Sequence, residues 1–482
     1  MQPVKPTDGV DLGARKAGGQ DARSASAAAI QPAVARALIA ALEQECAAYC
    51  ILTGYEQLPE RFDTDIDFMV GRDDFPRIPA LIARVAERTG TRLLQSTQHE
   101  VSARAYFLVR QSGAKLSFVQ PDSTADYQHF GRTFLHADEV LRSRRWHPNG
   151  FWIPGAAVEF FYYLMKRLNK RDFTATHAAR LSRLFAEDPR SARALLARVW
   201  SGEQLAALET MAASGEWSRL QLDLRPFRQT LAHYSAAGPA EKAPLAWHRA
   251  VHTLDRILRP TGACISFMGP DGCGKSSVIE AVTREFKPGF REIRYFHLRP
   301  SLLKRNTVAG AAVVDPHAKP PRGALSSILR LGYLAADYIA GYLLRVKPLL
   351  IRTTLVIFDR YYYDMLIDSR RFRYGGPRWL PKLVAKLIPR PELVILLNAP
   401  AEVLWARKRE VAFEEVVRQQ QAYLALCRGL PSAVIIDAAQ PLEAVIRDVN
   451  DAILSRFSCR TYKRLGLPAD RRSFSSQREL NG

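Results

Sequence analysis

The chain has 482 residues, 47% of them hydrophobic and 24% charged, and this length predicts roughly two to four domains. The composition excludes a chain that is disordered throughout, a collagen-like chain and a disulfide scaffold. The 69 Lys and Arg residues outnumber the 48 Asp and Glu residues, which gives a formal net charge of +21. This excess of positive charge favours anionic partners such as nucleotides, nucleic acid or acidic lipid. A proteome that is generally rich in arginine would explain it equally well, so the charge alone identifies no partner.

The sequence favours a protein of a reducing compartment. Its six cysteines form no CxxC pair and have no His at zinc-ligand spacing. Residues 1–29 hold no apolar segment of the kind that a secretory signal requires. Arg330, Asp337 and Arg345 interrupt the longest apolar stretch, roughly residues 323–346, and charge inside a bilayer is costly. We therefore expect a buried or amphipathic helix there, no transmembrane segment and a cytoplasmic protein.

The first part of the chain predicts a tail and then an α+β domain. Residues 1–29 lack apolar periodicity and are expected to form a disordered tail. A domain is expected over residues 30–233, with a helical part from about residue 158 to residue 222. Its first elements are expected to be a helix near residues 31–48, strands over 50–53 and 66–70, a helix over 75–89, and a hairpin of 104–110 with 115–119.

The second part predicts an α/β domain. Residues 234–258 are expected to form a linker and a short helix, and residues 458–482 a basic flexible tail. Between them, over residues 259–457, short apolar runs alternate with helical patterns, which predicts a parallel sheet covered by helices on both faces. The runs are residues 263–268, 354–358, 393–397 and 434–436.

The strongest motif is the segment of residues 269–276, which matches GxxxxGK[ST] between an apolar strand and a helical pattern. Its glycines allow backbone N–H groups to converge on phosphate oxygens, and the helix N-terminus adds its dipole. The motif predicts ATP and Mg²⁺ as ligands, with Lys275 on the β- and γ-phosphates and Ser276 supplying a hydroxyl to the metal. The expected nucleotide-binding residues are Gly269, Asp271, Gly272, Cys273, Gly274, Lys275, Ser276 and Ser277. The plainer alternative is an incidental Gly-rich turn.

Two further elements complete the expected phosphoryl-transfer site. Asp359 ends an apolar strand, where an acid can act on Mg²⁺, and Arg360 beside it can clamp an acceptor phosphate. Arg407 and Arg409 lie on an expected helix that could close over the transferred group, and only one of them can point squarely into the site. The alternatives are a surface ion pair at a strand end and a solvated helix face. The expected catalytic residues are thus Lys275, Asp359, Arg360, Arg407 and Arg409, with Ser276 and Asp359 on the metal.

Residues 263–456 resemble the thymidylate kinase family of nucleoside monophosphate kinases. The P-loop is similar to that family's GxDGxGK[ST], and residues 359–361 are similar to its DR[YFH] block. Residues 391–398 resemble the strand before its lid, and residues 435–443 resemble its last strand and adenine-side loop. Chains of this build also resemble kinase-like proteins associated with bacterial surface polysaccharide synthesis.

The resemblance implies roles for residues on the acceptor side. It implies that Asp271 approaches the acceptor and that Arg360 holds the acceptor phosphate. Gly272 stands where some members have an Arg, which leaves cationic help to the lid. Three segments depart from the family: Asp364 replaces a Ser, residues 297–300 replace a Glu-Pro-Gly-Gly block, and residues 369–377 differ from a standard thymine-binding segment.

A second constellation of acids lies in the first domain. Asp65 and Asp67 are two apart on an expected strand and so share a face, and Asp122 follows a later strand. Three carboxylates of this kind can hold Mg²⁺ and activate a hydroxyl for attack on an α-phosphate. The plainer alternative is an acidic turn that caps a strand.

The order of elements around these acids, over about residues 48–170, resembles the polymerase-β-type nucleotidyltransferase core. Tyr55 departs from that pattern, because a bulky residue after Gly54 is expected to crowd the triphosphate loop. Lys166 and Arg167 could face a phosphate, but the helical pattern favours a solvated face for them.

Together the patterns predict an ATP-dependent phosphotransferase domain joined to a nucleotidyltransferase-like domain whose activity stays open. The expected partners are ATP and a small phosphorylatable acceptor, without nucleic acid. The oligomeric state is open, with a dimer among the options. The alternatives are a sugar or small-molecule kinase on the same scaffold and a non-catalytic ATP-binding regulatory or scaffolding protein. Multiple turnover of an acceptor distinguishes the enzymes from the scaffold.

Overall fold

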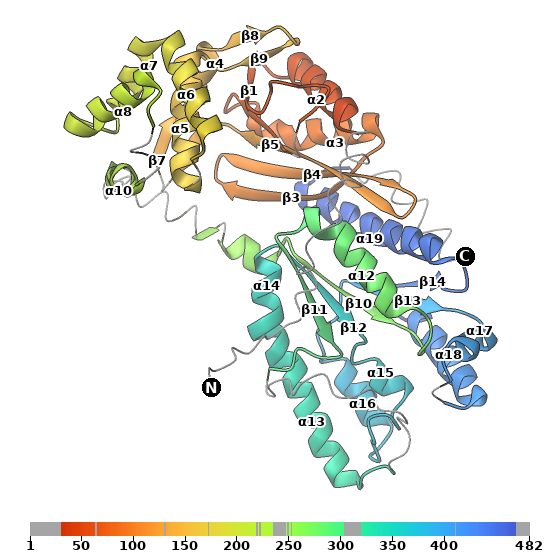
Figure 1. The fold of residues 1–482 in the computed structure, drawn as a ribbon. Coiled ribbons are helices and arrows are strands. Elements are labelled where there is room, and N and C mark those ends of the chain that lie inside the picture. Colours follow the sequence, from red (N-terminus) through yellow and green to blue (C-terminus); the bar gives the residue numbers. More distant parts are fainter. Residues whose placement is uncertain are drawn as a thin grey trace. The chain divides into compact units, whose positions relative to one another are not determined.

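The computed structural model describes most of the chain in two compact units (Figure 1). The described residues are 30–62, 65–129, 132–171, 173–217, 220, 223–234, 247, 250–251, 253–302, 320–409 and 411–468. Of these, residues 30–110 and 118–253 form one unit, and residues 111–117 and 254–468 form the other. The tail expected over residues 1–29 and residues 235–246 of the expected linker lie outside the described residues, while residues 253–258 are helical as expected. No helix in the described part is both long and apolar enough to cross a bilayer.

The N-terminal unit is built on a five-stranded sheet of mixed direction, in the order β1-β2-β5-β4-β3. The strands are β1 (Tyr49–Thr53), β2 (Asp65–Val70), β3 (Arg92–Glu100), β4 (Ala103–Ser112) and β5 (Lys115–Thr124). β1 runs antiparallel to β2, and β2 runs parallel to β5. Helices α2 (Gln31–Glu45) and α3 (Ile78–Thr89) pack against each other, as their apolar periodicity predicts. The expected hairpin is present, while β3 was not predicted.

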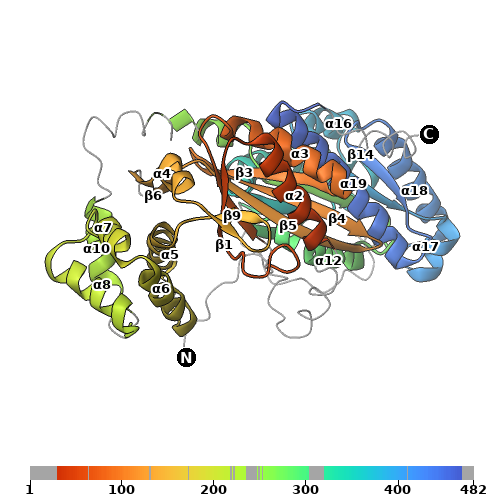
Figure 2. The same cartoon turned by 90° about the horizontal axis from the view of Figure 1, so that it is seen from above.

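A helical extension completes this unit, and Figure 2 shows its helices gathered together beyond β1. It contains α5 (Ala156–Lys170), α6 (Ala175–Glu187), α7 (Pro189–Leu196), α8 (Gly202–Ser214) and α10 (Arg225–Tyr234). The aromatic residues Phe160 and Phe161 on α5 are fully buried in one apolar cluster with these helices. Smaller elements precede the extension: β6 (Tyr127–His129), β7 (Arg132–Leu135), α4 (Ala137–Arg142), β8 (Arg145–His147) and β9 (Phe151–Ile153).

The C-terminal unit holds a five-stranded parallel sheet in the order β11-β12-β10-β13-β14. The strands are β10 (Ala263–Met268), β11 (Glu292–His297), β12 (Thr354–Asp359), β13 (Leu393–Asn398) and β14 (Ala433–Asp437). Four of them occupy the predicted apolar runs. β11 was not predicted, because this edge strand is mostly half-buried and carries charged residues among its apolar ones.

Helices cover the sheet on both faces, because alternate side chains of each strand point to opposite sides. The helices are α12 (Lys275–Phe286), α13 (Ala324–Gly341), α14 (Lys347–Ile351), α15 (Asp364–Ile367), α16 (Trp379–Ala385), α17 (Ala401–Arg407), α18 (Phe413–Arg428) and α19 (Leu442–Leu465). One face of β10, β12 and β13 packs with α13, α14 and α18 in a single apolar cluster. On the other face α12 and α19 pack against each other.

The apolar stretch over residues 323–346 is helical as predicted, and forms α13 followed by a π-helical turn, Tyr342–Val346. The flexible tail expected over residues 458–482 is wrong as far as Leu465, because α19 continues to that residue and buries Ser458 completely. Residues 469–482 lie outside the described residues. Arg460 holds this last part of the helix, since its Nη1 donates to Glu392 at 2.6 Å and to the carbonyl of Gly262 at 3.0 Å.

Candidate active site

The P-loop lies between the carboxyl end of β10 and the start of α12, as predicted. Gly269 has a φ of +142°, and a Cβ there would lie 2.5 Å from the carbonyl oxygen of Leu397, so only glycine fits. Gly274 precedes the helix with a φ of +86°. These conformations direct the loop around the N-terminus of α12, where free N–H groups and the helix dipole favour phosphate.

The side chains of the P-loop have distinct positions. Lys275 is buried, and its Nζ donates to the carbonyls of Gly269 at 2.8 Å and Pro270 at 2.9 Å, which holds the ammonium inside the loop. Cys273 is buried against the same ammonium, with its Sγ 3.5 Å from Nζ. Ser276 and Ser277 are exposed at the first turn of α12. The loop thus offers a cation and hydroxyl groups at one helix end.

Asp359 lies at the carboxyl end of β12, next to β10 and in register with Phe267. The Tyr295 hydroxyl donates to its Oδ2 at 3.0 Å, and its Oδ1 is buried without a hydrogen-bond partner among the described residues. A buried carboxylate oxygen of this kind needs a ligand, and Mg²⁺ prefers oxygen donors. Asp359 and the Ser276 hydroxyl therefore fit the metal that the P-loop predicts.

Arg360 is held between two carboxylates. Its backbone has a φ of +69°, and its N–H donates to the carbonyl of Phe267 at 2.9 Å. Its Nη1 donates to Asp364 at 2.8 Å, and its Nη2 donates to Asp271 in the P-loop. Burial opposes the charge of Arg360, but the charges of Asp364 and Asp271 outweigh that effect and raise the pKa. Arg360 is thereby fixed at the P-loop, where the acceptor phosphate is expected.

Asp271 has a second basic partner that was not among the expected site residues. Arg371 donates from Nη1 to Oδ2 of Asp271 at 3.0 Å. Burial raises the pKa of Asp271, but the charges of Arg360, Lys275 and Arg371 hold it well below its usual range. Asp364 is likewise fixed, since the Tyr423 hydroxyl donates to its Oδ1 at 3.1 Å. Hence the Asp that replaces the family's Ser serves to hold Arg360.

The expected lid residues lie beside the P-loop, but their geometry differs from the prediction. α17 ends at Arg407, so Arg409 is not on that helix. A Cβ on Gly272 would lie 3.6 Å from the Cβ of Arg407, which places the Arg407 stem against the loop. Its Nη1 donates to the carbonyl of Ala438 at 2.9 Å, whereas Arg409 stacks on Trp405 with its guanidinium 4.4 Å from the ring centre. Which of the two serves catalysis stays a prediction.

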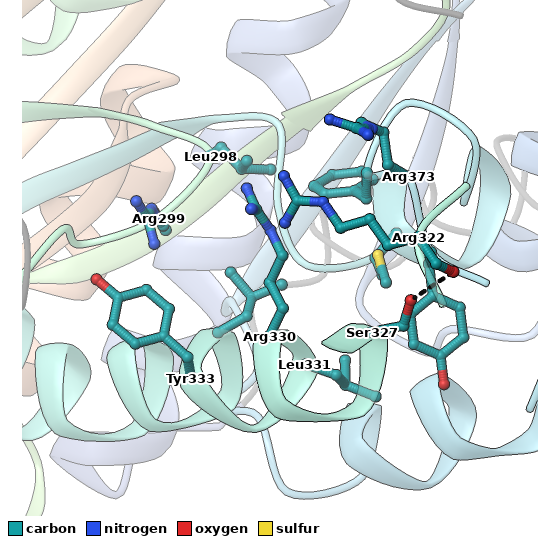
Figure 3. Close-up of a pocket in the computed structure, with 12 residues that line it drawn as sticks. Leu298, Arg299, Arg322, Ser327, Arg330, Leu331, Tyr333 and Arg373 are labelled. Carbon is teal, nitrogen blue, oxygen red and sulfur yellow. Dashed lines mark hydrogen bonds between the residues drawn. The ribbon is translucent and has the colours of Figure 1, made fainter. Parts of the chain in front are cut away.

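A cavity of about 600 Å³ lies among α13, the segment after β11 and the segment after α15 (Figure 3). Four arginines line it: Arg299, Arg322, Arg330 and Arg373. Apolar and aromatic side chains form the rest of its wall, with Ser327: Leu298, Leu331, Tyr333, Leu334, Met365, Phe372 and Tyr374. The sequence did not reveal this cavity, although Arg373 lies in the segment of residues 369–377 that departs from the family pattern.

The carboxylates of the N-terminal unit occupy two neighbouring parallel strands. Asp67 on β2 is in register with Asp122 on β5. Burial, together with the charges of Asp67 and Asp65, raises the pKa of Asp122 to about 7. Lys166 forms an ion pair with Asp67 and is only 21% exposed, so the solvated face expected for it is wrong. The described residues contain no group of three or more His, Cys, Asp or Glu side chains placed to hold a metal ion.

Tyr55 does not crowd the loop that begins at Gly54. Its side chain is buried, and its hydroxyl donates to Glu159 at 2.6 Å beneath the guanidinium of Arg180. Gly54 has a φ of +73° and open space where a Cβ would stand. The expectation of crowding at this position is therefore wrong. Arg167 is buried as well, which contradicts its expected exposure.

Comparisons with known proteins concern the C-terminal half of the chain. The family model described as Thymidylate kinase matches residues 267–449. The chain is 26% identical to a thymidylate kinase of Lacticaseibacillus casei (strain BL23), over 41% of this chain and 97% of that protein. It is 28% identical to a probable thymidylate kinase of Pyrobaculum aerophilum, over 40% of this chain and 96% of that protein. A thymidylate kinase-like domain thus occupies this region, and the match does not reach the N-terminal unit.

Proposed function

We propose that the C-terminal unit transfers the γ-phosphoryl group of ATP to a nucleotide or a related small phosphorylated acceptor. The observation that carries this proposal is the convergence of the P-loop, Asp359 and Arg360 at the carboxyl ends of β10 and β12. Ligands of open parallel sheets bind at such strand ends. The similarity to thymidylate kinases supports the same class of reaction.

In the proposed reaction an acceptor oxygen forms a bond to the γ-phosphorus while the bond to the bridging oxygen breaks and ADP leaves with that electron pair. Catalysis consists of positioning and neutralising charge. Lys275 meets the donor phosphates, and Arg360 holds the acceptor phosphate in line with them. Mg²⁺, held by Ser276 and Asp359, would supply charge neutralisation at the donor phosphates.

The proposal is tested by following ADP release with ATP, Mg²⁺ and a panel of nucleoside monophosphates, sugar phosphates and neutral sugars. We expect saturable turnover that depends on a phosphorylated acceptor. Turnover with neutral sugars alone would replace the proposal by a sugar kinase. Binding of ATP without any acceptor turnover would favour a regulatory or scaffolding role. A link with surface polysaccharide assembly is compatible with either the enzyme or the scaffold.

Two secondary proposals concern the setting of this reaction and the N-terminal unit. We place the protein in the cytoplasm, because it uses ATP and its six cysteines are all unpaired. The N-terminal unit is proposed to be nucleotidyltransferase-like, because Asp67 and Asp122 are adjacent on parallel strands and Tyr55 is turned away from Gly54. Mg²⁺-dependent release of pyrophosphate from nucleoside triphosphates tests this second activity.

A further inference from the structure

Two of the segments that line the arginine-lined cavity also contact residues of the candidate active site. Leu298 lines the cavity, and the Leu298 N–H donates to the carbonyl of Asp359 at 2.9 Å. Arg373 lines it two residues after Arg371, which binds Asp271 of the P-loop. The cavity therefore begins where the acceptor is expected. Its volume of about 600 Å³ lies within the range of about 300–1,000 Å³ that small-molecule sites occupy.

Backbone contacts bring two of the arginines together. The Arg322 N–H donates to the carbonyl of Arg373 at 3.1 Å, so two segments distant in the sequence run side by side. Gly375 permits this approach, because a Cβ there would lie 2.1 Å from the carbonyl oxygen of Arg322. Ser327 stabilises the contact between these two segments, since the N–H of Gly375 donates to its Oγ at 2.9 Å. The like charges are thus held together by the fold.

Figure 3 shows the guanidinium of Arg330 directed from α13 toward that of Arg322. Burial, and then the charges of Arg322, Arg299 and Arg373, lower the pKa of Arg330 from its ordinary value. Arginine nevertheless stays charged at neutral pH, so the repulsion persists until an anion enters. An arrangement that concentrates like charge in a concave site is an anion-binding arrangement.

The charge of the cavity exceeds what one phosphate neutralises. Arg299 has an acidic partner, the fully buried Asp337 at 3.4 Å. Among the described residues that line the cavity there is no Asp or Glu, so Arg322, Arg330 and Arg373 add about three positive charges. A phosphate monoester carries about −1.5 to −2 at neutral pH. Arg360 and Arg371, at the P-loop end, are separate cations that can meet the reacting phosphate.

We propose that the acceptor carries two phosphate groups, one that faces the P-loop and receives the γ-phosphoryl group, and a second that Arg322, Arg330 and Arg373 hold. This inference rests on the proposed function and narrows its acceptor to a bisphosphate. The apolar and aromatic wall of the cavity contacts the carbon skeleton between the two groups. The skeleton is either a nucleoside or a sugar, and the test separates these sources.

The test compares acceptors that differ only by the second phosphate. Thymidine 5′-monophosphate is paired with thymidine 3′,5′-bisphosphate, and fructose 6-phosphate with fructose 1,6-bisphosphate. Calorimetry on the full chain with Mg²⁺ and ADP measures their affinities, and ADP release measures kcat/KM. In at least one pair we expect the bisphosphate to bind about 10-fold or more tightly than its partner, since charge-assisted bonds to arginine are strong. Equal affinities within both pairs would overturn the inference.

Variants tie the preference to the arginines. Arg330→Gln is expected to abolish the advantage of the bisphosphate and leave ADP affinity unchanged, whereas Arg330→Lys retains part of it. Arg447→Gln is the matched control, because Arg447 is an exposed arginine on α19 outside the cavity. A full preference in Arg330→Gln and in Arg322→Gln would overturn the assignment. Because calorimetry needs no turnover, the two failures are distinguishable: a bisphosphate preference without ADP release would contradict the proposed function, whereas ADP release with equal affinities would overturn only the second phosphate site.

Discussion

Arg371 donates to Asp271 at 3.0 Å, so a residue one hundred positions along the chain is tied to the P-loop. The other oxygen of the same carboxylate accepts from Arg360. One carboxylate therefore joins the strand end that carries Asp359 to the segment that leads into the arginine-lined cavity. A change at Asp271 is expected to affect both folding and acceptor turnover, because the two arginines lose their shared partner.

The Asp271 ion pairs predict a pH-dependent stability. The pKa of Asp271 is lower in the folded than in the unfolded state. Its contribution to the free energy of unfolding is therefore present at pH values above the unfolded-state pKa of about 3.9, and it is lost as the pH falls toward the folded-state pKa. At pH 6 we expect Asp271→Asn to lower the free energy of unfolding by about 1–3 kcal/mol. Urea unfolding should show a smaller difference from the parent at pH 3. A difference that stays constant down to pH 3 would contradict the ion-pair account.

Lys275→Ala is expected to lower kcat for ATP turnover by about 10²–10³, which is the loss typical of one preorganised charge-stabilising donor. The ammonium lies inside the loop against the carbonyls of Gly269 and Pro270, so no other side chain of the loop replaces it. Lys287→Ala is the matched control, because that lysine is exposed at the far end of α12. ADP release measured for both variants and the parent decides the matter. Parent-like turnover in Lys275→Ala would overturn the P-loop assignment.

Much of the C-terminal fold could be predicted, because its signals are local. The P-loop is recognised from a short motif between an apolar strand and a helical pattern. The buried strands appear in the sequence as short runs of apolar residues. β11 escaped prediction because an edge strand is buried on only part of its surface. The end of α19 escaped because Arg460 looks solvent-facing in sequence, whereas it binds Glu392.

The acceptor side could not be predicted for a different reason. Arg373 is distant in the sequence from Arg322 and Arg330, and the backbone pairing of Arg322 with Arg373 brings it into one group with them. Likewise, the sequence shows that Tyr55 follows Gly54 but not that its hydroxyl reaches Glu159, more than one hundred residues away. Long-range partners decide the direction of such side chains, and local periodicity carries no information about them.

Asp364→Ser, which introduces the residue that the family has there, is expected to destabilise the protein. Arg360 and Asp364 are 9% and 3% exposed, and removal of one partner from a buried ion pair costs about 3–5 kcal/mol. Glu292→Ser is the control, because the side chains of the Arg294–Glu292 pair are 36% and 42% exposed and pairs near the surface contribute about 0–1 kcal/mol. Denaturant unfolding measures both changes. Equal small losses would show that Asp364 does not hold Arg360.

We expect the activities of the two units to be independent, and substitution of the aspartates in the N-terminal unit tests this. If that unit transfers nucleotides, Asp65→Asn with Asp67→Asn should abolish pyrophosphate release and leave ADP release by the C-terminal unit nearly unchanged, because the two sites use separate residues. Both assays are run on the full chain, with Asp73→Asn as a control at an exposed acid of the same unit. Parent-like pyrophosphate release in the double variant would remove these carboxylates from the chemistry.

The lid prediction separates two arginines that are two residues apart. Charge develops on the equatorial oxygens of the transferred group, and Gly272 offers no cation there. The stem of Arg407 lies against Gly272, whereas the guanidinium of Arg409 stacks on Trp405. Release of the Ala438 carbonyl by Arg407 would free Nη1 for the phosphoryl group. We therefore expect Arg407→Ala to lower kcat by about 10³ or more with little change in ATP affinity, and Arg409→Ala to retain near-parent turnover. If both variants turn over like the parent, the cation comes from elsewhere, and Arg371, already bound to Asp271, is the next residue to substitute.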